Sequence, residues 1–154
     1  MNRNLNKIIL CIGTSDCIGD SLGPMVGEHL YNNINKSNIY IYGNLKNNIT
    51  YKNINIILNK LNTQIKRHYI ILVDSALSNK NYIGKIIVSK NKMVIGGALD
   101  KQNYQLGDLS IKGIVGENKY NCIENYDELN NVSMKLIKKL SSQISNKILR
   151  ILNV

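Results

Sequence analysis

Two aspartates follow apolar segments of strand length, and they are the residues best placed for chemistry. Asp20 lies in the polar, glycine-rich segment 13–24, which comes after the apolar segment 7–12. Asp74 directly follows the apolar segment 69–73. Two carboxyl groups that lie close together share one proton as a coupled pair. The ionised member can then activate a water molecule while the protonated member donates to a carbonyl oxygen, as in aspartic proteases.

Both aspartates also have ordinary structural roles open to them. An aspartate before a helix is a common cap, and an aspartate at the end of a strand often forms a turn. If the pair is catalytic, we expect Asp20 to be the more acidic member, because a helix starting near Pro24 favours a negative charge beside it. Asp16, in the same loop, is interpreted as a solvated turn residue.

The same segments lack the motifs of two other classes of protein. Ser75 and Ser78 have no recognisable histidine partner and no Gly-x-Ser-x-Gly motif, which disfavours a serine hydrolase. Gly13, Gly19 and Gly23 have the spacing of neither a dinucleotide-binding loop nor a P-loop, and no Gly-Lys-Ser/Thr follows them. Dinucleotide binding is therefore the weaker alternative to a hydrolase that uses carboxyl groups.

Cysteine and histidine are too few and too scattered to predict a metal site. Cys11, Cys17 and Cys122 form no Cys-x-x-Cys pair, and we interpret them as buried free thiols in a reducing compartment. His29 and His68 are the only imidazole ligands that the sequence offers. We therefore predict no metal ligands, and no cofactor.

The composition is that of one globular domain spanning residues 1–154, with 44% hydrophobic and 19% charged residues. The formal net charge is +10, but the lysines are scattered singly apart from the adjacent pair 138–139, which disfavours nucleic acid as a partner. No apolar run approaches the roughly 20 residues of a membrane helix, which excludes a membrane partner. The apolar segment 8–12 is shorter than the h-region of a secretory signal, about 7–15 residues, so we expect a cytoplasmic protein.

The hydrophobic pattern predicts a mostly parallel sheet between layers of helices. The segments 7–12, 39–42 and 69–73 are continuous apolar runs, typical of strands that are covered on both faces. Between them, a helix follows Pro24, and a second helix is indicated by an apolar stripe over 54–65. Gly27 would allow the first helix to approach the sheet closely.

The remainder of the chain predicts a β-rich insertion and a long C-terminal helix. Short strands are expected at 84–89, 93–95 and 109–115, and one helix at about 126–152. The fold class is therefore α/β, with three αβα layers. If the first and third strands are neighbours, Asp20 and Asp74 meet at the switch point of the sheet, where ligands of such folds bind.

Several stretches resemble the germination protease of spore-forming bacteria and its smaller relatives, the YyaC-type sporulation proteins. The resemblance extends over most of the chain and lies in the segments 13–24, 42–45, 73–78 and 107–115, which contain Gly-Thr-Ser-Asp-Cys-Ile-Gly-Asp, Tyr-Gly-Asn-Leu, Val-Asp-Ser-Ala-Leu-Ser and Gly-Asp-Leu-Ser-Ile-Lys-Gly. The family's glycine-rich stretch after the fourth strand appears here as the segment 95–100, without its usual Pro-Gly.

The resemblance implies a phosphorylase/hydrolase-like fold and an endopeptidase connected with sporulation. The two catalytic aspartates of the germination proteases carry over onto Asp20 and Asp74, and the substrates of that family are small acid-soluble spore proteins. The protein would then act on a protein or peptide in the cytoplasm of the forespore or mother cell. The residues assigned to substrate binding are Gly13, Thr14, Ser15, Ser75, Gly96 and Gly97.

Hydrogenase maturation proteases are similar in their wider fold, and their acidic metal-binding position falls at Asp20. Their third metal ligand, a histidine late in the sheet, is matched by neither His29 nor His68. Two alternatives remain: a metal-dependent peptidase that holds a divalent ion at Asp20 and Asp74, and a catalytically silent protein that binds peptides. The apolar face of the terminal helix also leaves a homo-oligomer open.

Overall fold

The computed structural model describes residues 5–95 and 104–154 of the 154-residue chain. Its main sheet has five strands in the order β2-β1-β3-β7-β4, in which only β4 runs antiparallel to its neighbour. The strands are β1 (Asn6–Cys11), β2 (Ile39–Tyr42), β3 (His68–Ser78), β4 (Ile86–Ser89) and β7 (Leu109–Glu117). This is the mostly parallel α/β sheet that the sequence predicts.

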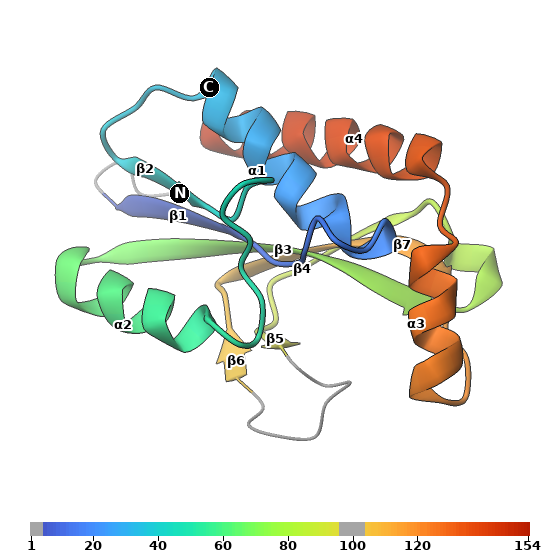
Figure 1. Ribbon diagram of the computed structural model, residues 1–154. Helices are drawn as coiled ribbons and strands as arrows, with labels where there is room; N and C mark the ends of the chain where they lie inside the picture. The colour runs from blue at the N-terminus through green and yellow to red at the C-terminus, as the bar shows by residue number, and fades with distance from the viewer. Residues whose placement is uncertain (1–4, 96–103) are drawn as a thin grey trace.

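Helices cover both faces of this sheet (Figure 1). On one face lie α1 (Leu22–Asn33) and α4 (Met134–Leu152). On the other face lie α2 (Ile54–Gln64) and a small antiparallel sheet of β5 (Met93–Ile95) and β6 (Tyr104–Leu106). The remaining elements are two short 3-10 helices, η1 (Gly19–Ser21) and η2 (Lys80–Tyr82), and α3 (Cys122–Asn130).

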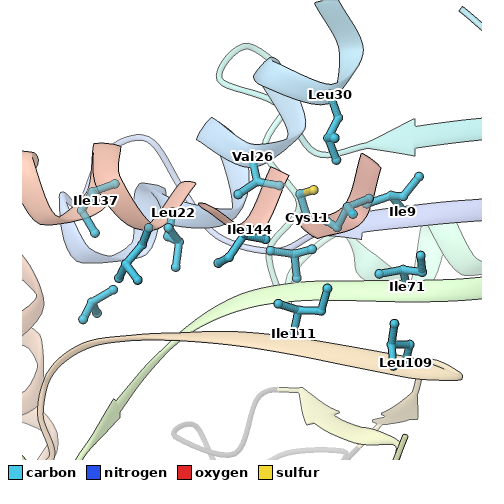
Figure 2. Packing of buried hydrophobic residues seen from close by; sticks show 14 of the residues in the cluster. Ile9, Cys11, Leu22, Val26, Leu30, Ile71, Leu109, Ile111, Ile137 and Ile144 are labelled. Atoms are coloured by element: carbon cyan, nitrogen blue, oxygen red, sulfur yellow. The ribbon is translucent and has the colours of Figure 1, made fainter. Parts of the chain in front are cut away.

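The core is divided in two by the sheet, because successive side chains of a strand point to opposite faces. In β1, Ile9 and Cys11 face α1 and α4, whereas Ile8 and Leu10 face α2, and all four are fully buried. Figure 2 shows the first of these clusters, where α1 and α4 pack side chains against the sheet. Continuous apolar strands are thus explained by helices on both sides.

The close approach of α1 to the sheet depends on Gly27, as the sequence predicts. A Cβ atom at Gly27 would lie 1.7 Å from the carbonyl oxygen of Gly43, in the loop that follows β2. Gly43 has a φ of +88°, and a Cβ there would lie 2.0 Å from the carbonyl oxygen of Cys11. Two glycines therefore allow α1, β1 and the loop after β2 to pack in contact.

The prediction that the third strand ends at Val73 is wrong. β3 continues to Ser78, so Asp74 and Ser75 lie inside the strand and not after it. The apolar run ends at Val73 because burial decreases there, but the backbone continues to pair with β7 through Ser78 and Glu117. Pairing with a neighbouring strand thus determines the end of β3, and the hydrophobic pattern does not show it.

The single C-terminal helix of the prediction is two helices, α3 and α4, separated by residues 131–133. Val132, between them, is 7% exposed and belongs to the core, so the apolar periodicity continues through the break and hides it.

The strand expected at 84–89 begins only at Ile86, because Gly84 has a φ of +84° in the preceding turn. Strand β6 has no counterpart in the prediction.

The interpretation of the cysteines is correct for two of the three thiols. Cys11 and Cys17 are free and buried, whereas Cys122, at the start of α3, is exposed. Within residues 5–95 and 104–154, no helix is both long enough and apolar enough to span a membrane.

Candidate active site

Asp20 is held beside the sheet by the sharp turn that ends β1. Gly13 has a φ of +138°, and a Cβ atom on it would lie 2.0 Å from the carbonyl oxygen of Asp20, so only glycine fits there. The N–H of Thr14 donates to the Asp20 Oδ2 atom at 3.1 Å and to its carbonyl oxygen at 3.2 Å. The loop therefore folds back on itself and places η1, with Asp20, next to β3.

Asp74 lies on β3, one residue beyond the last residue that pairs with β1. Its neighbours Leu72 and Val73 belong to the α2 and the α1/α4 sides of the core respectively, so alternation places Asp74 on the α2 side. On β7, Lys112 is its register partner and lies on the same side of the sheet. Asp74 is partly buried, and its side chain adjoins a positive charge.

Ser75 connects the two aspartates. Its hydroxyl group donates to the Asp20 Oδ1 atom at 3.3 Å, and its backbone N–H lies near enough to the carboxyl group of Asp74 to lower the pKa of that group. Asp20 reaches β3 from the side of α1, and Asp74 belongs to the opposite side. The two carboxyl groups thus converge on the segment of β3 that β1 no longer covers.

The surroundings of the pair keep a proton on Asp74 at neutral pH. Burial and the negative charge of Asp20 together raise the pKa of Asp74 to about 8. Lys112 and the Ser75 N–H lower this pKa, but by less. Burial also raises the pKa of Asp20, and the Thr14 N–H and the Ser75 hydroxyl group oppose this rise. One ionised and one protonated carboxyl group is the arrangement that acid–base chemistry on a carbonyl requires.

Asp20 also has the structural role that the sequence left open. Its hydrogen bond from the Thr14 N–H stabilises the loop after β1, although it does not cap α1 in the usual way. The other carboxylate oxygen of Asp20 accepts a hydrogen bond from the Ser75 hydroxyl group, so Asp20 does more than stabilise the loop. Asp16 is exposed, as expected of a solvated turn residue.

The residues assigned to substrate binding divide into four groups. Thr14 and Ser75 contact Asp20 directly. Ser15 instead accepts and donates hydrogen bonds in the loop after β2: its N–H donates to the Asn48 Oδ1 atom at 2.6 Å, and its hydroxyl oxygen accepts from Asn48 at 3.1 Å. Gly13 is buried and shapes the turn. The last group is Gly96 and Gly97, which lie outside the described residues.

Among the described residues, the possible metal ligands of the sequence do not gather around Asp20 and Asp74. Across the described parts of the chain, no three histidine, cysteine, aspartate or glutamate side chains cluster as a metal site would require. His29 is exposed on α1, and His68 lies at the opposite end of β3 from Ser78, with its Nδ1 atom 2.9 Å from the carbonyl oxygen of Ile65. Lys112 beside Asp74 would further repel a cation.

Two polar residues of this region were not predicted. Lys112 acts on the charge of Asp74, and Asn48 holds the loop that carries Ser15. On β7, the residues on either side of Lys112, Ile111 and Gly113, face α1 and α4. Alternation along the strand could therefore have predicted that Lys112 faces the opposite side of the sheet. The sequence does not show the strand register that pairs Lys112 with Asp74.

The fold is shared with a protease of known structure. The structure is similar to the [NiFe] hydrogenase maturation protease HycI from Thermococcus kodakarensis KOD1, with a TM-score of 0.63 over 97% of this chain and 93% of that one. The sequence identity of that pair is 18%, so the similarity shows the fold alone.

The chain belongs to the family described as "Protein of unknown function (DUF1256)", which it matches over residues 1–147. It is also 27% identical over 138 residues to the "Uncharacterized protein YyaC" of Bacillus subtilis (strain 168). That alignment takes in 90% of this chain and 65% of the relative, so the chain spans about two thirds of the relative's length. The expected resemblance to YyaC-type proteins and to hydrogenase maturation proteases is thereby confirmed.

Proposed function

We propose that this protein is an endopeptidase in which Asp20 and Asp74 activate water against a peptide bond. The observation that carries the proposal is the pair itself: two carboxyl groups at the carboxyl end of a parallel sheet, with the pKa of Asp74 raised to about 8 partly by the charge of Asp20. Such ends of parallel strands are where ligands of open α/β sheets bind. The protease-like fold and the motifs around both aspartates support the same function.

The pair has the protons that hydrolysis needs. Ionised Asp20 takes a proton from water as the water oxygen bonds to the carbonyl carbon, and protonated Asp74 gives its proton to the carbonyl oxygen. When the carbon–nitrogen bond breaks, the leaving nitrogen takes the proton from Asp20, and Asp74 recovers a proton from a hydroxyl group of the intermediate. Both aspartates return to their starting states, and Ser75 keeps them in place through its hydroxyl group and its N–H.

The proposed substrates are small acid-soluble spore proteins, cut in the cytoplasm of the forespore or mother cell. The motifs in 13–24 and 73–78 support this choice, because they resemble those of the germination proteases. The similarity to the YyaC protein of Bacillus subtilis (strain 168) agrees with the resemblance to YyaC-type sporulation proteins.

The test is incubation with a purified small acid-soluble spore protein, comparing the wild type with Asp20→Asn and Asp74→Asn by mass spectrometry of the products. We expect each variant to lose about 10²–10⁴-fold in rate, the usual contribution of a general acid or base. Asp16→Asn is the matched control, because Asp16 lies in the same loop and is exposed. Cutting by both variants at the wild-type rate would contradict the proposal.

Two further outcomes identify the alternatives. Loss of activity in EDTA, with recovery on adding a divalent metal, would point to a metal-dependent peptidase that holds the ion at Asp20 and Asp74. Binding of the spore protein without cleavage at any pH would point to a catalytically silent peptide-binding protein.

A further inference from the structure

Beyond the end of β1, one edge of β3 has no neighbouring strand among residues 5–95 and 104–154. β1 pairs with β3 as far as Cys11 and Val73, and the chain then leaves the sheet at Gly13. β3 continues for five more residues, 74–78, which pair with β7 on their other side. The sheet therefore has an internal notch between β3 and the turn after β1, at the position of the two aspartates.

The backbone groups that face this notch can be identified. The carbonyl oxygen of Val73 accepts from the N–H of Ile12, so the groups of Val73 point toward β1. The carbonyl oxygen of Ser78 accepts from the N–H of Asn118, which follows β7. Since alternate residues of a strand point the same way, the backbone groups of Ser75 and Leu77 face the notch.

Among the described residues, these notch-facing groups lack backbone partners. The Ser75 carbonyl oxygen and both backbone groups of Leu77 have no backbone hydrogen bond from residues 5–95 or 104–154. Exposed donors and acceptors along a strand edge are the usual binding site of an extended peptide, which adds to the sheet as a further strand.

The surroundings also favour a peptide over a small ligand. Four surface cavities lie beside α1, β2, β4 and α4, and neither Asp20 nor Asp74 lines any of these four. Asp20 approaches the notch from the α1 side, and Asp74 from the α2 side. A strand that fills the notch would therefore pass between the two carboxyl groups.

We propose that the substrate binds in extended form along the Ser75–Leu77 edge of β3, where β1 would continue if it were longer. This inference rests on the proposed function and adds how the substrate is held. The edge hydrogen-bonds to main-chain groups, so recognition requires an unfolded segment and tolerates many side chains. Proline is expected to be rejected at the position whose N–H would donate to the Ser75 carbonyl oxygen, because proline has no N–H.

Amide hydrogen exchange tests the edge directly, using the Asp20→Asn variant so that the bound spore protein is not cut. On binding, we expect the Leu77 N–H to exchange at least about tenfold more slowly, since it gains a hydrogen bond. Ala76 is the internal control, because its backbone groups face β7 and remain bonded in both states.

N-methylation of the peptide substrate is a second test. Because alternate residues of a bound strand face β3, N-methylation at every second residue should weaken binding, and N-methylation at the residues between them should not.

Each outcome decides between the two proposals. Protection of Leu77 together with cleavage by the wild type supports both. Cleavage by the wild type that leaves the exchange of Leu77 unchanged overturns the edge proposal and leaves the endopeptidase standing, whereas binding with neither cleavage nor protection of Leu77 overturns both. Protection of Leu77 without cleavage supports the edge and contradicts the endopeptidase, and a spore protein that is neither bound nor cut overturns both.

Discussion

The charge of Asp74 depends strongly on the rest of the molecule. Burial and the charge of Asp20 both disfavour its ionised form, and Lys112 only partly opposes them. Asp20 keeps hydrogen-bond donors from both Thr14 and Ser75, which favour its ionised form. Two aspartates with the same intrinsic chemistry thus have different surroundings, and burial raises the pKa of both.

The pH dependence of cleavage should report the proton on Asp74. The active form has this carboxyl group protonated, so the rate should fall as pH rises through about 8. In Lys112→Met, the positive charge that lowers the pKa of Asp74 is missing, so the pKa should rise and the alkaline fall of kcat/KM should move to higher pH.

The control for this shift is Lys90→Met, which removes the same charge at an exposed position. It should leave the alkaline limb of the profile in place. A profile of Lys112→Met that coincides with the wild type would show that another group controls the alkaline fall.

At the scale of elements, the site exists because neighbouring strands have different lengths. β1 ends at Cys11 and β3 at Ser78, so β3 has a segment that β1 does not cover, and η1 brings Asp20 beside this segment from the α1 side. The position of η1 depends in turn on α1, which follows it directly and packs on the sheet through Gly27.

Gly27→Ala should therefore destabilise the fold. The new Cβ atom would lie 1.7 Å from the Gly43 carbonyl oxygen, which must move for α1 to stay docked. Overpacking of this kind costs about 1–3 kcal/mol, measurable as a lower midpoint in urea unfolding. His29→Ala, at an exposed position of the same helix, is the control and should change stability by less than about 0.5 kcal/mol.

At the scale of the whole molecule, the long C-terminal helix α4 is part of the hydrophobic core. The apolar face of α4, including Ile137, Leu140 and Ile144, is fully buried in the core against α1 and the sheet (Figure 2). It is therefore not available to pair two copies of the chain. The predicted homo-oligomer would need another surface, and it stays a prediction.

Global stability should depend on pH through Asp74. Its pKa is higher in the folded chain than the ordinary value of about 3.9, so its contribution to stability is complete at low pH and is lost as pH rises through about 8. Asp74→Asn has no charge at this position, so the Tm of the variant should exceed that of the wild type by an amount that grows as pH rises from about 4 to about 8. Each kcal/mol of stability regained should raise the Tm by about 2–4 °C. Asp16→Asn, at an exposed position, should show no such gain.

A variant Asp74→Asn that is inactive but more stable than the wild type at pH 8 would also separate a catalytic defect from misfolding. If the Tm of the variant instead falls below that of the wild type at every pH, the protonated carboxyl group of Asp74 stabilises the fold through hydrogen bonds, and the cost of burying its charge is the smaller effect.

The sequence by itself determined the parallel sheet, its helix layers and the segments that carry the two aspartates. It could do so because burial on both faces requires continuous apolar strands, and because glycines such as Gly27 are needed where backbones touch. Only the tertiary structure decided that β3 extends past β1, that Lys112 adjoins Asp74, and that Ser75 joins the two carboxyl groups. These features depend on strand register and on hydrogen bonds between distant segments, and a backbone hydrogen bond leaves no mark on the residue types that form it.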